Sequence, residues 1–229
     1  MKQQQPRRLW LIPYWFVLIL TFCIASFFLL TAAMGYRYNP EFRKWQKTSI
    51  LVADLNPRDS KLNLDGKVYP LNGSKRLYNI LPGIYHTTVT KGGYIPWQSY
   101  LTLRSGYVEE LPKVTLFFQH PEELASTLAD RQLLESGYID PKIQLSNGEL
   151  RYGTRLVTRF ANPPVAAALL STDNHLAYII DDEIHIIGVD GTNDQIIYRR
   201  RSSIPTKIMA NGNRLIFEDD GLVQVIRIR

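Results

Sequence analysis

An uncharged apolar stretch near the N-terminus constrains this chain more than any other feature. It runs from Leu9 to Ala33, within a predicted membrane segment over residues 9–35. A helix of about 20 apolar residues crosses the hydrocarbon core of a bilayer. Measured from Pro13, which is tolerated in a first helical turn, to Ala33, a helix would be about 31 Å long at about 1.5 Å per residue. The sequence therefore predicts a protein anchored in a membrane by one helix.

Two alternatives to a permanent anchor are weaker. A cleaved signal peptide has an apolar core of about 7 to 15 residues, and this stretch is longer, although Thr31-Ala32-Ala33 is an acceptable cleavage sequence. Lipoprotein processing needs a small residue before the modified cysteine, whereas Phe22 precedes Cys23. Because long domains translocate largely regardless of flanking charge, we predict a signal anchor, with residues 1–8 as a cytoplasmic tail and the later domains outside the cell membrane.

Aromatic residues flank the apolar stretch on both sides, where such rings favour the headgroup layer. The predicted membrane-interface residues are Trp10, Tyr14, Trp15, Tyr36, Tyr38, Phe42 and Trp45. Residues 36–47 also carry four basic side chains and are predicted to form a juxtamembrane stem. The net charge of +6 then favours acidic partners, which outside the membrane are anionic lipid or an envelope polymer and not nucleic acid.

The single cysteine limits the chemistry of the segment that follows the stretch. Cys23 lies within the apolar residues, so the later domains have no disulfide, no thiol nucleophile and no cysteine metal site. Their length is sufficient for one or two small domains, whose stability must come from packing.

Residues 48–118 have the pattern of a small β domain. The dipeptides Asp65-Gly66 and Asn72-Gly73 tolerate the positive φ of tight turns, and Leu62 and Leu64 alternate with polar residues before the first of them. A strand from Ile84 to Thr90 is rich in β-branched and aromatic residues. We predict an antiparallel β-sandwich of six or seven strands.

The same segment resembles the PEGA domain of bacterial and archaeal envelope proteins. The residues that carry the resemblance are Asn56-Pro57, Leu62-Asn63-Leu64-Asp65-Gly66-Lys67, Leu81-Pro82-Gly83-Ile84-Tyr85, Lys91-Gly92-Gly93-Tyr94-Ile95-Pro96-Trp97 and Val114-Thr115-Leu116. The chain departs from the family at its eponymous motif, where Pro57 is kept but Arg58-Asp59-Ser60 replace Glu-Gly-Ala. The resemblance implies a non-catalytic surface or adhesion module.

Three aromatic residues of this segment are a candidate ligand site. Tyr94, Trp97 and Tyr100 could form a ledge for sugar or peptide, although aromatics at a turn between two strands more often fill the end of a sandwich core. Both interpretations are retained as expectations, with the core as the favoured one.

A connector over residues 119–142 precedes the second domain. Pro121 to Gly137 is predicted as a helix, with Pro121 in its first turn, Glu122 and Glu123 near the positive end of the dipole and Gly137 as its stop. Residues 143–229 contain short, regularly spaced strands, which favour a sandwich, barrel or propeller.

Part of this second domain resembles a TolB-like β-propeller. The pattern from Leu169 through Asn174 to Ile179, followed by Glu183 to Ile187 and Val189 to Asn193, begins again at Met209 to Phe217, about 40 residues later. Two such blades fit the segment, whereas closed propellers need about four or more. We predict a short, open propeller-like domain, with homo-oligomerisation through its open β edges as the alternative.

No catalytic constellation is evident. In a two-residue turn at Asp181-Asp182, His185 lies opposite Tyr178 and not opposite His175, so these histidines do not form a cross-strand metal pair. The acidic groups at 181–183, 190–194 and 218–220 could hold calcium, but Asp and Asn are also what turns require. The run Arg199-Arg200-Arg201 is predicted to be a solvated loop.

These observations predict a membrane-anchored all-β protein with no enzymatic activity and no cofactor. Its function is predicted to be that of a non-catalytic envelope module that binds or scaffolds protein or cell-wall glycan partners. The alternative is a calcium-dependent carbohydrate-binding protein or an envelope hydrolase that uses the acidic loops.

Overall fold

The computed structural model describes residues 11–170, 174–204 and 206–229. The chain is mostly β-structure, with 49% of residues in strands and 14% in helices. It divides into two compact units, and both contain strands of the segment 48–118. The first unit holds the described residues up to Val52 together with Arg76–Ile84 and Thr102–Glu110, and the second holds Ala53–Lys75, Tyr85–Leu101 and Leu111–Arg229.

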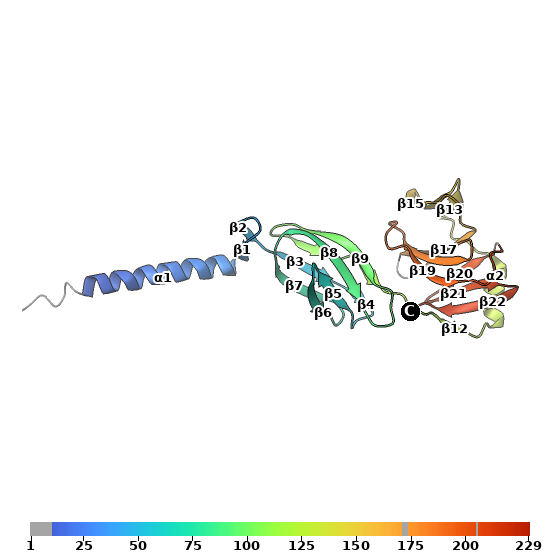
Figure 1. Cartoon of the computed structure of the whole chain (residues 1–229), viewed down its shortest axis with the longest axis horizontal. Helices are drawn as coiled ribbons and strands as arrows, with labels where there is room; N and C mark the ends of the chain where they lie inside the picture. The colour runs from blue at the N-terminus through green and yellow to red at the C-terminus, as the bar shows by residue number, and fades with distance from the viewer. Residues whose placement is uncertain (1–10, 171–173, 205) are drawn as a thin grey trace, which may run out of the picture. The chain divides into compact units, whose positions relative to one another are not determined.

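In the first unit the apolar stretch forms helix α1 (Leu11–Ala33), drawn in blue in Figure 1. From Pro13 to Ala33 its mean hydropathy is 2.5, and 0% of its most apolar window is buried. α1 is the one helix of the described chain that is long and apolar enough to cross a membrane. Pro13 lies in its first turn, as expected.

A β-hairpin and a three-stranded sheet complete the first unit. Strands β1 (Tyr36–Asn39) and β2 (Lys44–Lys47) pair, so the predicted stem is a folded hairpin. The sheet has the order β10-β3-β7, formed by β3 (Ser49–Ala53), β7 (Lys75–Ile80) and β10 (Val108–Glu110). β10 runs parallel to β3, so the prediction of a purely antiparallel sandwich is wrong. The long chain between these strands permits the parallel return.

The second unit begins with a four-stranded sheet. Its order is β6-β5-β8-β9, formed by β5 (Lys61–Leu64), β6 (Lys67–Pro70), β8 (Gly83–Thr90) and β9 (Trp97–Leu103). β4 (Leu55–Asn56) pairs in parallel with β11 (Val114–Thr115). Leu62, Leu64 and Val89 are at most 3% exposed and share one face, which is the burial that a sandwich requires.

Of the two turns predicted in this segment, one forms a hairpin. Asp65-Gly66 joins β5 to β6, with φ angles of 44° and 89°. Asn72-Gly73 lies between strands of different sheets, and the Gly73 N–H donates to the Arg58 carbonyl at 2.8 Å.

Three antiparallel sheets make up the C-terminal part of the second unit. The first is β13 (Ile143–Ser146), β14 (Glu149–Tyr152) and β15 (Arg155–Arg159); the second is β16 (Ala166–Leu170), β17 (His175–Ile180), β18 (Glu183–Gly188) and β19 (Gln195–Arg199); the third is β20 (Ile208–Asn211), β21 (Arg214–Asp219), β22 (Leu222–Arg227) and β12 (Glu122–Leu124). The sequence predicted about two blade-like sheets. The count differs because residues 143–159 pair among themselves and form a sheet of their own.

The tight turns of these sheets agree with the sequence. Asp181-Asp182 connects Ile180 to its partner Glu183, and His185 lies opposite Tyr178, as predicted. Asn147-Gly148 and Asp220-Gly221 have positive φ angles throughout. Asx residues and glycine are needed here because other residues rarely adopt this conformation.

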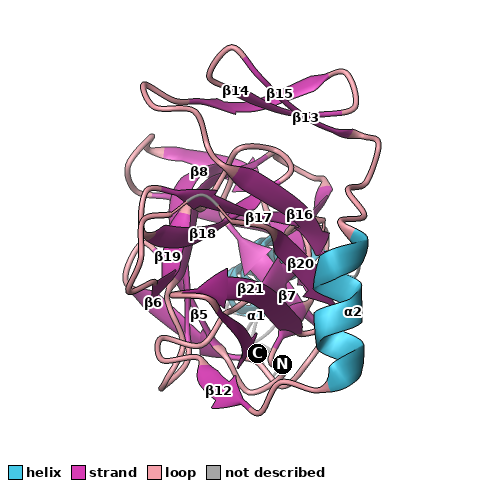
Figure 2. Cartoon of the chain, turned by 90° about the vertical axis from the view of Figure 1, so that its right-hand side faces the viewer, coloured by secondary structure: helices cyan, strands magenta, loops and turns pink. Residues whose placement is uncertain are grey.

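The sheets pack face to face through separate apolar layers. Ile179, Ile186 and Phe217 belong to a layer between the second and third sheets, and Leu150, Leu176 and Ile187 belong to a layer between the first and second. The second sheet is therefore buried on both faces, which explains its continuous apolar runs. Figure 2 shows β13–β15 at the top of this stack and the cyan helix α2 along its right-hand edge.

The predicted helix from Pro121 to Gly137 is wrong in its first half. Glu122–Leu124 is strand β12, which pairs with β22, and α2 spans Leu128–Ser136. Thr127 caps α2 through a reciprocal capping box with Asp130, and Gly137 ends it with φ 60°. The cross-strand ion pair of Glu122 with Arg227 fits the strand position. The cap signal at Thr127 and Asp130 is visible in the sequence, and it marks the true start of the helix.

The prediction of a solvated loop at Arg199-Arg200-Arg201 is wrong at its centre. Arg200 is 4% exposed and donates to the carbonyls of Asp181 at 2.6 Å and Ile204 at 3.0 Å. Asp219 is also buried, and its carboxylate accepts hydrogen bonds from the backbone N–H groups of Arg201 and Ser202 at 2.9–3.0 Å. These contacts tie the loop after β19 to the end of β21.

Removal of the Asp219 carboxylate tests this tie. We expect Asp219→Ala to lower the free energy of unfolding by about 2–3 kcal/mol, because two N–H groups lose a charged acceptor. Thermal unfolding of the full chain in detergent, followed by circular dichroism, measures the change. Glu218→Ala, at an exposed neighbouring carboxylate, is the control and should change stability by less than about 0.5 kcal/mol. Equal losses in the two variants would contradict the assignment.

Candidate functional site

A cavity of about 280 Å³ lies within the second unit, where the start of β9 meets loops of the C-terminal sheets. Its walls combine one large aromatic ring with hydroxyl, amide and charged side chains. The lining residues are Trp97, Ser99, Pro112, Lys113, Asn174, His175, Gly188, Val189, Asp190 and Thr192. This mixture of one apolar surface and several polar groups is typical of small-ligand sites.

Strand alternation places Trp97 and Ser99 at the cavity. Side chains two residues apart on a strand point to the same face, and Trp97 is 9% exposed. Two hydrogen bonds join this end of β9 to the loop after β18 and to the first residue of β19. The Gln98 N–H donates to Asn193 Oδ1 at 3.1 Å, and Gln195 Nε2 donates to the Pro96 carbonyl at 3.2 Å. The residues before and after Trp97 are therefore both hydrogen-bonded to the segment 193–195.

The opposite wall is a compact turn over residues 188–192. Asp190 Oδ1 accepts hydrogen bonds from the Thr192 N–H at 3.1 Å and from Thr192 Oγ1 at 2.7 Å. Gly191 has φ +83°, and a Cβ atom there would lie 2.4 Å from the Val157 carbonyl oxygen. Only glycine fits this position, because both the backbone conformation and the close approach exclude a side chain.

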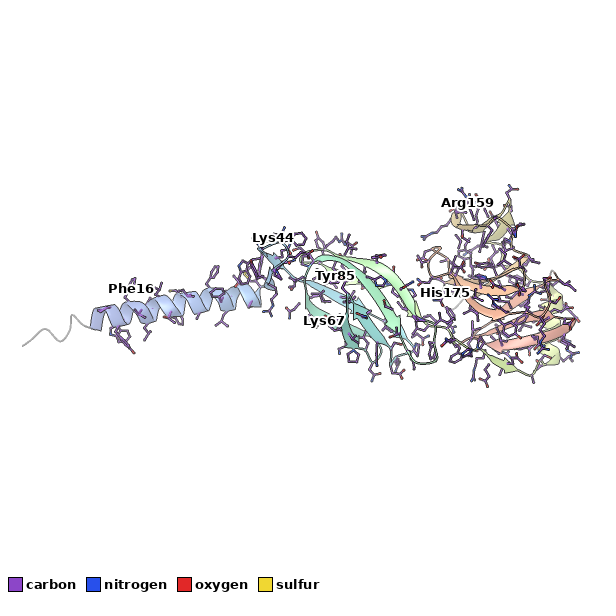
Figure 3. All side chains as sticks on the ribbon, in the orientation of Figure 1. Phe16, Lys44, Lys67, Tyr85, Arg159 and His175 are labelled. Carbon is purple, nitrogen blue, oxygen red and sulfur yellow. The ribbon has the colours of Figure 1, made fainter. Side chains whose placement is uncertain are left out.

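The cavity carries a defined pattern of charge. Burial lowers the pKa of His175 in spite of the nearby Asp190 carboxylate, so this imidazole is largely neutral at pH 7. For Asp190, burial alone would raise the pKa, but the hydrogen bonds from Thr192 hold it below its usual value. Figure 3 labels His175, whose ring makes an edge contact with Phe117 at 5.1 Å. The cavity lining thus combines an ionised carboxylate, a neutral imidazole and the side chain of Lys113.

The three predicted ledge aromatics do not share one surface. Trp97 faces the cavity, whereas Tyr100 lies three residues further along β9 and points to the other face. The Tyr100 side chain is 75% exposed, and its ring contacts that of His86. Tyr94 packs on Phe118 with ring centroids 4.9 Å apart. Trp97 and Tyr100 are three residues apart on β9 and so point to opposite faces, and Tyr94 lies before this strand. Of the three rings, only that of Trp97 lines the cavity.

Of the predicted membrane-interface residues, Trp10 lies outside the described residues. Tyr14 and Trp15 lie in the first turns of α1 and make an edge contact at 6.3 Å. Tyr36, Tyr38, Phe42 and Trp45 all lie in the β1–β2 hairpin and its turn, next in the chain after α1.

A second polar cluster surrounds His185. Its Nδ1 is 3.1 Å from Asp194 Oδ1, its Nε2 is 3.1 Å from Glu183 Oε2, and its ring stacks on Tyr178 at 4.9 Å. The Tyr178 hydroxyl donates to Asp194 Oδ2 at 2.6 Å, and burial raises the pKa of this phenol. The members of the cluster bind one another across β17, β18 and the loop before β19, which is a stabilising network.

Three of the acidic side chains considered for calcium are engaged within the protein. Asp190 holds its own turn, Asp194 binds His185 and Tyr178, and Asp219 accepts two backbone N–H groups. Among the described residues no group of three or more His, Cys, Asp or Glu side chains is arranged to hold a metal ion.

The sequence did not reveal the cavity as a whole. Trp97 was a candidate ligand residue, but the sequence carries no signal that links it to His175 or Asp190. The Asp190-Gly191-Thr192 turn was recognisable, although only as turn chemistry. The sequence matches no protein-family model and no curated protein.

The pKa of His185 can be used to test the hydrogen bonds between this imidazole and the carboxylates of Asp194 and Glu183. Burial alone would lower this pKa, but hydrogen bonds and charge from Asp194 and Glu183 raise it above the ordinary value. Because the folded-state pKa is raised, the stabilisation is complete below the unfolded value of about 6.5 and is lost as pH rises through the folded-state pKa. We expect Asp194→Asn to lower the His185 pKa, measured by an NMR titration of the imidazole.

The matched control for this titration is Asp220→Asn, which removes an exposed carboxylate from a different hairpin. This control should leave the His185 titration unchanged. A His185 pKa that stays raised in Asp194→Asn would assign the effect to another group.

Proposed function

We propose that this protein is a membrane-tethered, non-catalytic binding module of the cell envelope, with its β domains outside the membrane. α1 supports the tether, because its apolar surface fits a bilayer in length and composition. The β-rich segments support the assignment of a PEGA-like sandwich followed by a propeller-like domain. In this proposal the partners are a cell-wall glycan or an envelope protein, bound at the surface of the second unit.

The cavity beside Trp97 is the observation that carries the proposal. Ligand sites for drug-sized molecules have volumes of about 300–1,000 Å³, so a cavity of about 280 Å³ accommodates one small unit of a polymer. The face of an indole ring carries partial negative charge and packs favourably against the C–H groups of a sugar. Ser99, Asn174 and Thr192 supply groups that can bond to hydroxyls and amides. This lining favours a single sugar residue of an envelope glycan.

The internal contacts of titratable groups outside the cavity support a structural role and not a catalytic one for those groups. His185, Asp194 and Tyr178 bind one another, and Asp219 binds the backbone of the neighbouring loop. A general acid or base needs hydrogen-bond access to a substrate, whereas these groups are already occupied. No contact among the described residues favours the competing proposal of a calcium-dependent lectin or hydrolase.

Ligand binding at the cavity is tested with the full chain in lipid nanodiscs. Replacement of Trp10, Trp15 and Trp45 by Phe leaves Trp97 as the sole tryptophan reporter. We expect soluble cell-wall glycan fragments to change the Trp97 emission in a saturable manner. We expect Lys113→Ala to weaken this binding about ten-fold, which corresponds to about 1.4 kcal/mol.

The matched control for the binding test is Tyr100→Ala, which removes an exposed aromatic ring from the other face of the same strand. It should leave the affinity unchanged. Loss of binding in Tyr100→Ala with normal binding in Lys113→Ala would move the site to the outer face of β9. Saturable binding of peptide stems without glycan would favour a protein partner.

The orientation is tested with a thiol at an exposed position. Cys23 lies within α1, so Ser74→Cys introduces the only thiol outside the apolar helix. We expect a membrane-impermeant maleimide to label this variant on intact cells, because residue 74 is outside in the proposed topology. The unmodified chain is the control and should remain unlabelled. Labelling only after cell lysis would contradict the proposed orientation and place residue 74 inside the cell.

A further inference from the structure

The β1–β2 hairpin is attached closely to the end of α1. Only Met34 and Gly35 separate the helix from β1. The Gly35 carbonyl accepts hydrogen bonds from both the N–H and the Oγ1 of Thr48, at 2.8 and 2.9 Å, where the chain leaves β2. The two ends of the hairpin are thus joined beside the helix terminus, which limits how far the hairpin can move from it.

Aromatic contacts fold the hairpin against the apolar part of the helix. The Trp45 ring lies 6.2 Å from the Phe28 ring of α1 and 5.9 Å from the Tyr38 ring across the hairpin. Phe28 is five residues before the end of α1, or about 7.5 Å along the axis at about 1.5 Å per residue. If α1 spans a bilayer, Trp45 is therefore held at the depth where the hydrocarbon core meets the headgroups.

The surface of the hairpin is both apolar and cationic. The side chains of Tyr38, Phe42 and Trp45 are 50–57% exposed. Four basic side chains and one acidic side chain give residues 36–47 a formal charge of +3, and all four basic residues are exposed. Figure 3 labels Lys44, whose Nζ lies 5.3 Å from the centre of the Phe42 ring.

We propose that the hairpin Tyr36–Lys47 is an interfacial membrane-binding element that lies in the headgroup layer and selects anionic phospholipids. The inference rests on the proposed membrane anchor and adds a second, lipid-selective contact to it. Aromatic rings favour this layer, and each basic side chain near an anionic surface contributes about 1 kcal/mol, a factor of about five in affinity. A water-exposed spacer would not need three large exposed rings.

The depth of the hairpin is measured by quenching of tryptophan fluorescence in the full chain. One variant keeps only Trp45, with Trp10, Trp15 and Trp97 replaced by Phe, and a second keeps only Trp15 as a reporter of the anchor. Both are reconstituted in phosphatidylcholine vesicles whose lipids are brominated near the top of the acyl chains. We expect loss of emission in both variants.

Two outcomes of the depth measurement separate the hairpin from the anchor. Quenching of Trp15 without quenching of Trp45 would overturn the inference while leaving the anchor intact. Absence of quenching in both variants would overturn the membrane anchor itself. Shielding of Trp45 that increases with protein density in the vesicle would show that a second copy, and not lipid, covers the hairpin.

Lipid selection is measured with the Trp45-only variant in mixed vesicles, with bromine placed either on phosphatidylglycerol or on phosphatidylcholine at equal mole fraction. We expect stronger quenching by the anionic lipid, and this preference should fall at high salt. Arg37→Gln with Lys44→Gln should lower the preference about five-fold per charge removed.

The matched control is Lys61→Gln with Lys67→Gln, which removes two exposed charges from β5 and β6, and it should leave the preference unchanged. Equal quenching by the two lipids in the parent variant would overturn the selection of anionic lipid. An equal loss of preference in the control would overturn its assignment to the hairpin.

Discussion

The exposed apolar surface of α1 is the constraint on which the rest of the structure depends. Its large apolar side chains from Tyr14 to Leu30 are 45–70% exposed, and full burial of each is worth about 1.5–3 kcal/mol. Their sum is on the order of 20 kcal/mol, which exceeds the stability of an ordinary domain at about 5–15 kcal/mol. No described part of the chain buries the most apolar window of α1, which is long and apolar enough to cross a membrane.

The hairpin and the β domains differ in how their apolar side chains are covered. The hairpin continues the apolar surface through Trp45 and adds basic side chains, so its composition suits the boundary between hydrocarbon and water. The C-terminal sheets instead cover one another, since Ile179, Ile186 and Phe217 form an internal layer. The cavity beside Trp97 lies where this packed stack meets β9, and its lining includes polar side chains.

Local chemistry explains which predictions were confirmed. The turns at Asp65-Gly66 and Asp181-Asp182 and the stop at Gly137 follow from φ angles that few residues tolerate, so neighbouring residues alone determine them. Glu122–Leu124 was predicted as helix because its charges suit a helix terminus, yet pairing with β22 is non-local and overrides that preference. Arg200 was predicted to lie in a solvated loop because it belongs to a run of three charged residues. Its burial is explained by the hydrogen bonds that its guanidinium donates to the carbonyls of Asp181 and Ile204.

The sequence by itself determined an apolar helix of membrane-spanning length, β-rich domains after it and most of their tight turns, because these depend on composition and on adjacent residues. The tertiary structure decided the parallel pairing of β3 with β10, the separate sheet at 143–159 and the meeting of Trp97 with His175 and Asp190. The first and third of these join segments that are distant in the chain, whereas the sheet at 143–159 pairs strands that are adjacent in the chain. Such contacts are selected by the total apolar area that packing removes from water, which no single stretch of sequence encodes.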